Sequence, residues 1–149
     1  NPIGFGTLSS ASSKYATGDT TGSASEVEAH NIVVGTNAAN GYTMTATGTT
    51  LVSGGNSIDA IGAANTAAAP GTEQFGVRLA ASGGVGTVSV PYAASGFAFD
   101  TTAFPDQIAG ASGASANTTY SARYLANITA NTEAGTYAST ITYVATANF

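Results

Sequence analysis

Few side chains in this chain of 149 residues could act as nucleophiles, bases or metal ligands. His30 is the single histidine, and cysteine is absent. A Ser–His–Asp triad would therefore depend on His30, and no Gly-x-Ser-x-Gly turn exposes a serine as α/β-hydrolases require. One histidine without cysteine also falls short of the ligand sets of the usual zinc sites. We expect a protein that is not an enzyme, with no catalytic residue and no cofactor.

The eight carboxylates are the remaining candidates for metal binding or acid–base chemistry. Glu26 and Glu28 are two residues apart, which places them on one face of a strand, where a solvated surface is the expected role. Asp100 and Asp106 border a loop without the alternating acidic residues of calcium-binding loops. The glycine-rich segment 83–86 lacks the lysine of a phosphate-binding loop and is typical of a turn. We therefore expect no metal site.

Charge is scarce in this chain, at 7% of residues, whereas soluble domains carry about 25%. Hydrophobic residues reach 43% and the mean hydropathy is +0.13, which favours a packed core over disorder. Three cations are too few to bind nucleic acid by releasing counterions from its phosphates. No apolar run approaches the roughly 20 residues of a membrane-spanning helix. The uncharged surface is poorly protected against self-association, which favours copies of the chain itself as the partner.

The elements that would position any site are short strands. Threonine, valine, isoleucine and tyrosine recur in runs separated by Gly, Asn, Ser and Pro, which is the pattern of strands and turns. Asn40-Gly41 suits a tight turn with positive φ, and the alanine-rich stretch 63–69 is expected to form a helical turn. The main strands are expected at 3–8, 26–36, 42–47, 75–81, 86–92, 96–99, 119–129 and 136–149.

About eight to ten strands with no alternation of strand and helix predict an all-β fold. We expect an antiparallel β-sandwich, Ig-like or jelly-roll-like, that forms a single domain over residues 1–149. No linker or composition shift divides the chain.

The first residues have the pattern of a strand that a neighbouring subunit could accept. Ile3, Phe5 and Leu8 supply apolar side chains within residues 1–8, and residues 9–25 follow as a flexible-looking connection rich in Ser, Thr and Gly. Polymers that assemble by strand addition use such a segment to complete the sheet of the next subunit. Two alternatives remain open, because residues 3–8 could equally be the first strand of their own sandwich.

Three segments resemble those of exported bacterial surface proteins. Residues 37–45 resemble an Asn-x-x-Asn-Gly-Tyr-Thr hairpin of such β-sandwiches, and residues 134–143 resemble the closing strand of WxL-type domains and fimbrial subunits. Phe5-Gly6-Thr7-Leu8 is similar to their opening segment. Tyr143 stands where WxL domains have Trp. The resemblance therefore implies a secreted surface β-sandwich but not cell-wall binding.

These features predict a structural subunit of an extracellular filament, pilus or other cell-surface assembly. Ile3, Phe5 and Leu8 are the expected assembly residues, added as a strand to a neighbouring copy. The chain opens at Asn1 rather than Met, which we interpret as removal of a leader during export. The alternative is a stand-alone adhesin or carbohydrate-binding surface domain with a glycan as partner. An exposed patch of tyrosines would favour that alternative.

Overall fold

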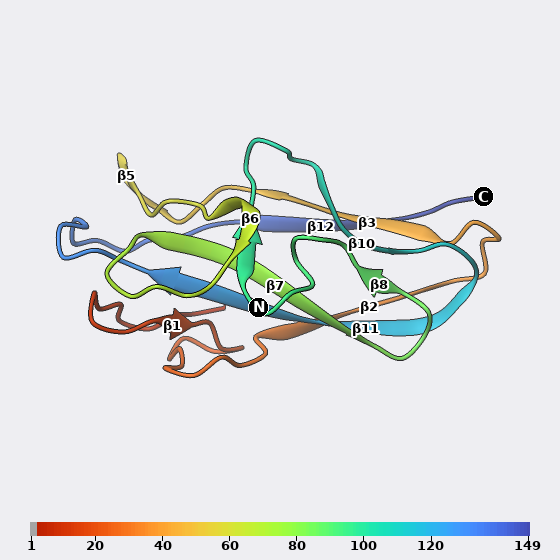
Figure 1. Cartoon of the computed structure of the whole chain (residues 1–149), viewed down its shortest axis with the longest axis horizontal. Helices are drawn as coiled ribbons and strands as arrows, with labels where there is room; N and C mark the ends of the chain where they lie inside the picture. The colour runs from red at the N-terminus through yellow and green to blue at the C-terminus, as the bar shows by residue number, and fades with distance from the viewer. Residues whose placement is uncertain (1–2) are drawn as a thin grey trace.

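The protein is a sandwich of two antiparallel sheets, described here from a computed structural model that covers residues 3–149 (Figure 1). This confirms the predicted fold class. No helix occurs among the described residues, so none of them forms a helix that could cross a membrane. The larger sheet contains β1 (Lys14–Tyr15), β2 (His30–Thr36), β6 (Gly62–Thr66), β7 (Gln74–Ser82), β9 (Phe97–Phe99) and β11 (Ser115–Asn127). The smaller contains β3 (Tyr42–Gly48), β8 (Thr87–Val88), β10 (Asp106–Ala111) and β12 (Ile141–Ala147), while β4 (Val52–Ser53) and β5 (Asn56–Ser57) form a separate hairpin.

Strand β11 is the centre of the larger sheet. Its 13 residues pair with β7 along one side and with both β1 and β2 along the other. In the smaller sheet the order is β12-β3-β10-β8, so β12 lies at an edge. The chain passes from the larger sheet to the smaller through residues 37–41, and this reversal makes β2 and β12 run in the same direction (Figure 1).

The turn between β2 and β3 confirms the prediction at Asn40-Gly41. Gly41 has a φ of 75°, which favours glycine, and a Cβ placed there would lie 1.9 Å from the carbonyl oxygen of Ala111. The close approach of Ala111 holds the first residues of β3 in register with the end of β10, where Ala111 pairs with Tyr42.

A pair of buried tyrosines joins the two sheets through the core. The hydroxyl of Tyr42 on β3 lies 2.6 Å from the hydroxyl of Tyr120 on β11, and both rings are buried. Burial and the hydrogen bond with Tyr42 raise the pKa of Tyr120, which keeps its hydroxyl neutral at physiological pH. Aliphatic and aromatic residues fill the core on either side of this pair, among them Met44, Val77, Leu79, Phe99 and Ile108.

Two expectations about local structure are wrong. The alanine-rich stretch 63–69 is not helical, because Gly62 and Thr66 pair with Phe99 and Phe97 and make residues 62–66 a strand. Seven residues are too few to nucleate a stable helix, so the available strand edge decides the structure. The strand expected at 86–92 is reduced to the two residues of β8, after which the chain turns through a cis peptide bond before Pro91.

We predict that Tyr120→Phe lowers the free energy of unfolding by about 1–3 kcal/mol, because the hydroxyl of Tyr42 would be left buried without a partner. The double variant Tyr42→Phe/Tyr120→Phe should lose less than the sum of the two single variants, since it leaves no unpaired hydroxyl. Urea unfolding of the four proteins measures this coupling. Strictly additive losses would show that the two hydroxyls do not stabilise the fold as a pair.

Candidate functional site

The N-terminal segment, residues 3–8, lies against its own subunit but is only weakly connected to the sheets by backbone hydrogen bonds. Its one β-bridge joins Gly4 to Thr17, and the Gly4 amide also donates to the carbonyl of Asp19 at 2.7 Å. The predicted strand at 3–8 is therefore present only as this bridge. The adjoining loop is close: a Cβ on Gly22, whose φ is 66°, would lie 1.9 Å from the carbonyl oxygen of Phe5.

Side chains, rather than backbone, hold this segment in place. Ile3, Phe5 and Leu8 are partly buried and all three pack against the core. Phe5 meets Phe75 of β7 edge-to-face, with 6.3 Å between the ring centroids. The structure thus brings the three predicted assembly residues together on one surface of their own sandwich.

Beside this segment lies a cleft of about 1140 Å³. Residues 3–8 form one wall, and residues 132–141, between β11 and β12, form the other. Phe75, Leu51 and Ile128 line it between these walls. The second wall is anchored where Ala138 and Val52 exchange two backbone hydrogen bonds of 2.9 Å. The exposed lining of the cleft is mainly apolar, so its surface suits apolar side chains better than charged ones.

Three rings form a polar group at one end of the cleft. His30 Nε2 lies 2.7 Å from the hydroxyl of Tyr124, which lies 2.7 Å from the hydroxyl of Tyr143. This chain joins β2, β11 and β12, and therefore both sheets. Burial raises the pKa of Tyr124 to about 12 and that of Tyr143 well above its ordinary value. Burial also lowers the pKa of His30, and the backbone hydrogen bond with Asn31 and the charge of Glu28 oppose this shift more weakly.

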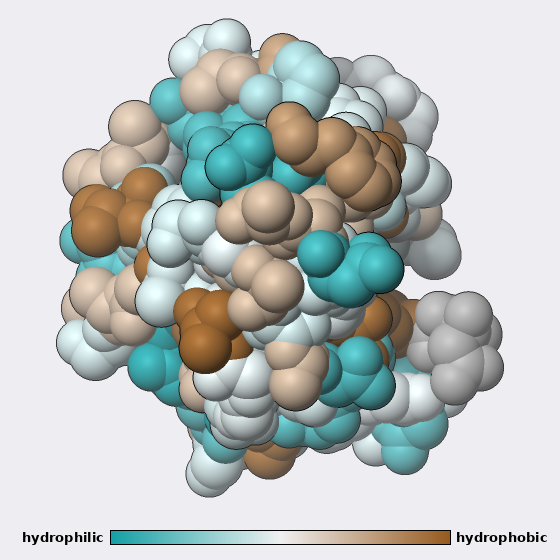
Figure 2. Space-filling model, turned by 90° about the vertical axis from the view of Figure 1, so that its right-hand side faces the viewer, coloured by the Kyte–Doolittle hydropathy of each residue, from teal (hydrophilic) through white to brown (hydrophobic). Residues whose placement is uncertain are grey.

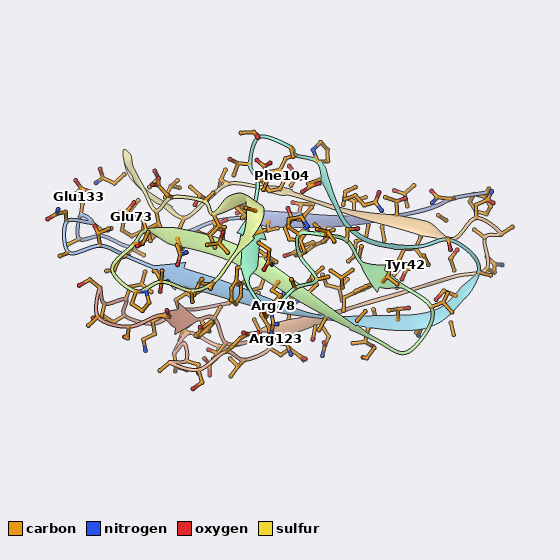
Figure 3. The ribbon with its side chains drawn as sticks, viewed as in Figure 1. Tyr42, Glu73, Arg78, Phe104, Arg123 and Glu133 are labelled. Atoms are coloured by element: carbon orange, nitrogen blue, oxygen red, sulfur yellow. The ribbon has the colours of Figure 1, made fainter. Side chains whose placement is uncertain are left out.

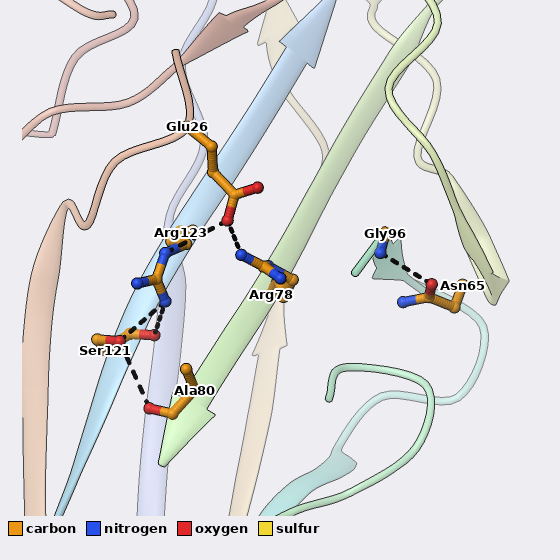
Figure 4. Close-up of polar contacts among 7 residues, drawn as sticks. All are labelled: Glu26, Asn65, Arg78, Ala80, Gly96, Ser121 and Arg123. Atoms are coloured by element: carbon orange, nitrogen blue, oxygen red, sulfur yellow. Dashed lines mark hydrogen bonds and ion pairs between the residues drawn. The ribbon is translucent and has the colours of Figure 1, made fainter. Parts of the chain in front are cut away.

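The arginines lie outside the cleft, on the outward face of β7 and β11 (Figures 3 and 4). Arg78 and Arg123 are direct cross-strand partners, an arrangement that repels unless an anion lies between them. Glu26 supplies it: one carboxylate oxygen contacts Arg78 and lies 3.3 Å from the Arg123 Nε. Two of the chain's three cationic side chains thus form ion pairs within the subunit.

The other carboxylates that the sequence singled out are also engaged separately. Glu28 accepts a hydrogen bond from the side chain of Asn31 at 2.6 Å, whereas Glu26 contacts the two arginines. Asp100 accepts from the amide and hydroxyl of Thr102. Asp106 accepts from the hydroxyl of Tyr92 at 2.7 Å. In residues 3–149 no group of three or more metal-ligating side chains gathers.

No tyrosine of the chain is fully exposed. Tyr42, Tyr92, Tyr120 and Tyr124 are buried, and the remaining three are partly buried. At the end of the sandwich near the C-terminus, hydrophobic residues stand singly among polar and small ones (Figure 2). Neither observation provides the exposed aromatic platform that a carbohydrate-binding surface requires.

Compared with protein-family models, with curated proteins and with solved structures, the chain matches none. The geometry of the chain itself is therefore the basis for its proposed function. Sequence reasoning found the apolar residues of the N-terminal segment but missed the opposite wall of the cleft. It also missed the His30–Tyr124–Tyr143 chain. These residues come from distant strands, and only their alternation within each strand was visible in the sequence.

We predict that Phe5→Ala lowers the free energy of unfolding by about 1–3 kcal/mol, less than the loss of a fully buried phenylalanine, because Phe5 is only partly buried. Val90→Ala is the control, since Val90 is 87% exposed and should change stability by less than about 0.5 kcal/mol. Urea unfolding measures both. Equal effects would mean that Phe5 does not hold the segment in place.

A second prediction concerns pH. The folded state lowers the pKa of His30 below its ordinary value of 6.5, so the unfolded chain binds the proton more tightly. The contribution of neutral His30 to stability is therefore complete above pH 6.5 and decreases as the pH falls toward 5. His30→Gln should remove this dependence, which thermal unfolding between pH 5 and 7.5 would detect. An unchanged pH profile in the variant would show that His30 does not cause the loss of stability at low pH.

Proposed function

We propose that this protein is a structural, non-catalytic subunit of an extracellular filament, pilus or other cell-surface assembly. Subunits are joined when the N-terminal segment of one copy takes the place that residues 3–8 occupy beside the cleft of the next. The observation that carries the proposal is the way residues 3–8 are held: three apolar side chains contact the core, while one β-bridge is the backbone's only strand pairing. The same side chains from a neighbouring copy would make the same contacts.

The chain that follows the segment supports exchange between subunits. Residues 9–13 separate the segment from β1, which is fixed by pairing Lys14 with Ala126 and Tyr15 with Leu125 of β11. Five extended residues span about 17 Å at roughly 3.4 Å each. Because β1 lies within the range 9–25 that was expected to be a connection, the proposal requires only residues 9–13 to change conformation. The N-terminal segment could therefore detach from its own subunit while the rest of the sandwich stays folded.

Composition supports the same proposal. Charged residues are only 7% of the chain, so few charged side chains stand in the way of contact between copies. Lack of cysteine agrees with an exported protein that does not depend on disulfides. The alternative, a carbohydrate-binding domain, is less well supported because every tyrosine is at least partly buried.

The proposal predicts that native material forms fibres and that Ile3→Ser/Phe5→Ser abolishes them. The reason is that two polar side chains would replace the apolar ones that seat in the neighbouring cleft. Negative-stain electron microscopy and pelleting by ultracentrifugation measure the outcome. A chain lacking residues 1–8 should likewise form no fibres.

Val90→Ser is the matched control, since it removes a similar apolar side chain from an exposed site and should leave fibres intact. Circular dichroism of each variant shows that the sandwich still folds. Fibres that persist in the double serine variant would rule out strand addition by the N-terminal segment. Monodisperse native material at all concentrations would favour a stand-alone surface domain.

A further inference from the structure

Exchange of the N-terminal segment replaces a contact within one subunit by the same contact between two. It therefore gains little free energy by itself, and a stable assembly requires a surface that is satisfied only between copies. The free edge of β12 has this property. It lies at the end of the smaller sheet, and no backbone hydrogen bond from another described segment reaches residues 141–147 on that side.

Edge strands are normally protected from such pairing by charges, proline or bulges. Strand β12 has none of these: its seven residues are Ile-Thr-Tyr-Val-Ala-Thr-Ala, and its pairing with β3 is regular from Ile141 to Ala147. Val144 on its outer face is 48% exposed. An uncharged and regular edge of this length is open to another strand.

The direction of its free backbone groups follows from the ends of the ladder. Asn148 donates to the carbonyl of Gly41 and accepts from Asn40, so its backbone faces β3. Antiparallel pairing alternates, so the backbones of Thr142, Val144 and Thr146 also face β3. The N–H and C=O groups of the alternate residues consequently point to the open edge, and these residues are Ile141, Tyr143, Ala145 and Ala147.

The inner face of β12 is incompletely covered. Ala145 and Ala147 are exposed, although their direct neighbours on β3, Met44 and Tyr42, are fully buried. The same face of β12 carries two large residues, Ile141 and Tyr143, both partly buried. Large side chains thus occupy the first half of the strand and small ones the second half.

We propose that β12 pairs antiparallel with β12 of a second copy, about a two-fold axis at Val144. In this register Tyr143 lies opposite Ala145 of the second copy and Ile141 lies opposite Ala147, so each large inner residue covers an exposed alanine. On the outer face, Thr142 lies opposite Thr146 of the second copy, and Val144 lies opposite Val144 of the second copy. The residues whose backbone groups point outward are the ones that exchange hydrogen bonds.

This register also suits the neighbouring cleft, which Ile141 and Tyr143 line. At that end the second copy contributes only alanines, which need little room. A single strand pair buries less surface than a stable interface requires, so the contact is weak between free subunits. It strengthens when an assembly holds the subunits together. No residue of the N-terminal segment takes part, so the inference is independent of the proposed exchange.

Cysteine cross-linking of the full chain tests the register, because the chain has no cysteine of its own. Val144 opposite its copy would be a non-hydrogen-bonded pair with Cα atoms about 4.5 Å apart, within the range that a disulfide bridges. Val144→Cys should therefore form a disulfide dimer at least tenfold faster than Val85→Cys, a control at another exposed valine. Non-reducing electrophoresis under mild oxidation measures the rates.

Two further variants distinguish this register from random collision. Thr142→Cys alone should not cross-link, because the two substituted positions would be four residues, or about 14 Å, apart along the strands at roughly 3.4 Å per residue. Mixed with Thr146→Cys it should form the mixed disulfide. Adding Ala145→Tyr to Val144→Cys should suppress the dimer, since tyrosine would then oppose Tyr143. Circular dichroism checks that the exposed substitution leaves the fold intact.

Equal rates for Val144→Cys and Val85→Cys would overturn the inference, as would rapid cross-linking of Thr142→Cys alone. The rates should be unchanged when Ile3→Ser/Phe5→Ser is added, which separates this test from that of N-terminal exchange. Loss of fibres with retained Val144 cross-linking would support both contacts. Retained fibres with no Val144 cross-linking would overturn only the pairing of β12.

Discussion

Buried tyrosine hydroxyls join the two sheets across a core of alanine, aliphatic and phenylalanine side chains. Tyr42 and Tyr120 meet across the middle, while Tyr124 connects Tyr143 with His30 near one edge. Each hydroxyl lies away from water, so it stabilises the sandwich only while its partner is in place. The Tyr42–Tyr120 pair constrains the spacing of the sheets where β3 faces β11. Residues 3–8 pack against the core through Ile3, Phe5 and Leu8.

Scarcity of charge has a second consequence. A soluble monomer usually protects sheet edges with lysine, glutamate or proline, but this chain has few of these residues, and β12 has none. Both arginines form ion pairs with Glu26 on the outward face of β7 and β11. The edge of β12 and the cleft beside the N-terminal segment are therefore unprotected surfaces on the same side of the molecule. In the proposed assembly, the cleft region would accept a segment through side chains, and the edge of β12 would accept a strand through backbone hydrogen bonds.

Much of the fold could be predicted from alternation and turn chemistry. The strand 42–47 and the Asn40-Gly41 turn agree with the structure, because both depend on local residue preferences. The alanine-rich stretch 63–69 could not be assigned, since its conformation is set by Phe97 and Phe99, more than 30 residues away. Ile3, Phe5 and Leu8 were recognisable as an apolar set, but the cleft was not, because its second wall begins at residue 132. Sequence alone does not reveal which distant segments come together.

The central claim is that the N-terminal segment seats in the cleft of a neighbouring subunit. Solid-state NMR on fibres assembled from an equal mixture of ¹³C-labelled and ¹⁵N-labelled subunits tests it directly. In such a sample, ¹⁵N–¹³C correlations arise only between different copies. Strand addition predicts correlations between the backbone of Phe5 and the side chain of Phe75, which meet within one subunit in the free protein. Correlations between Phe5 and Phe75 that appear only in uniformly labelled fibres would show that the segment stays in its own subunit, and would contradict the account.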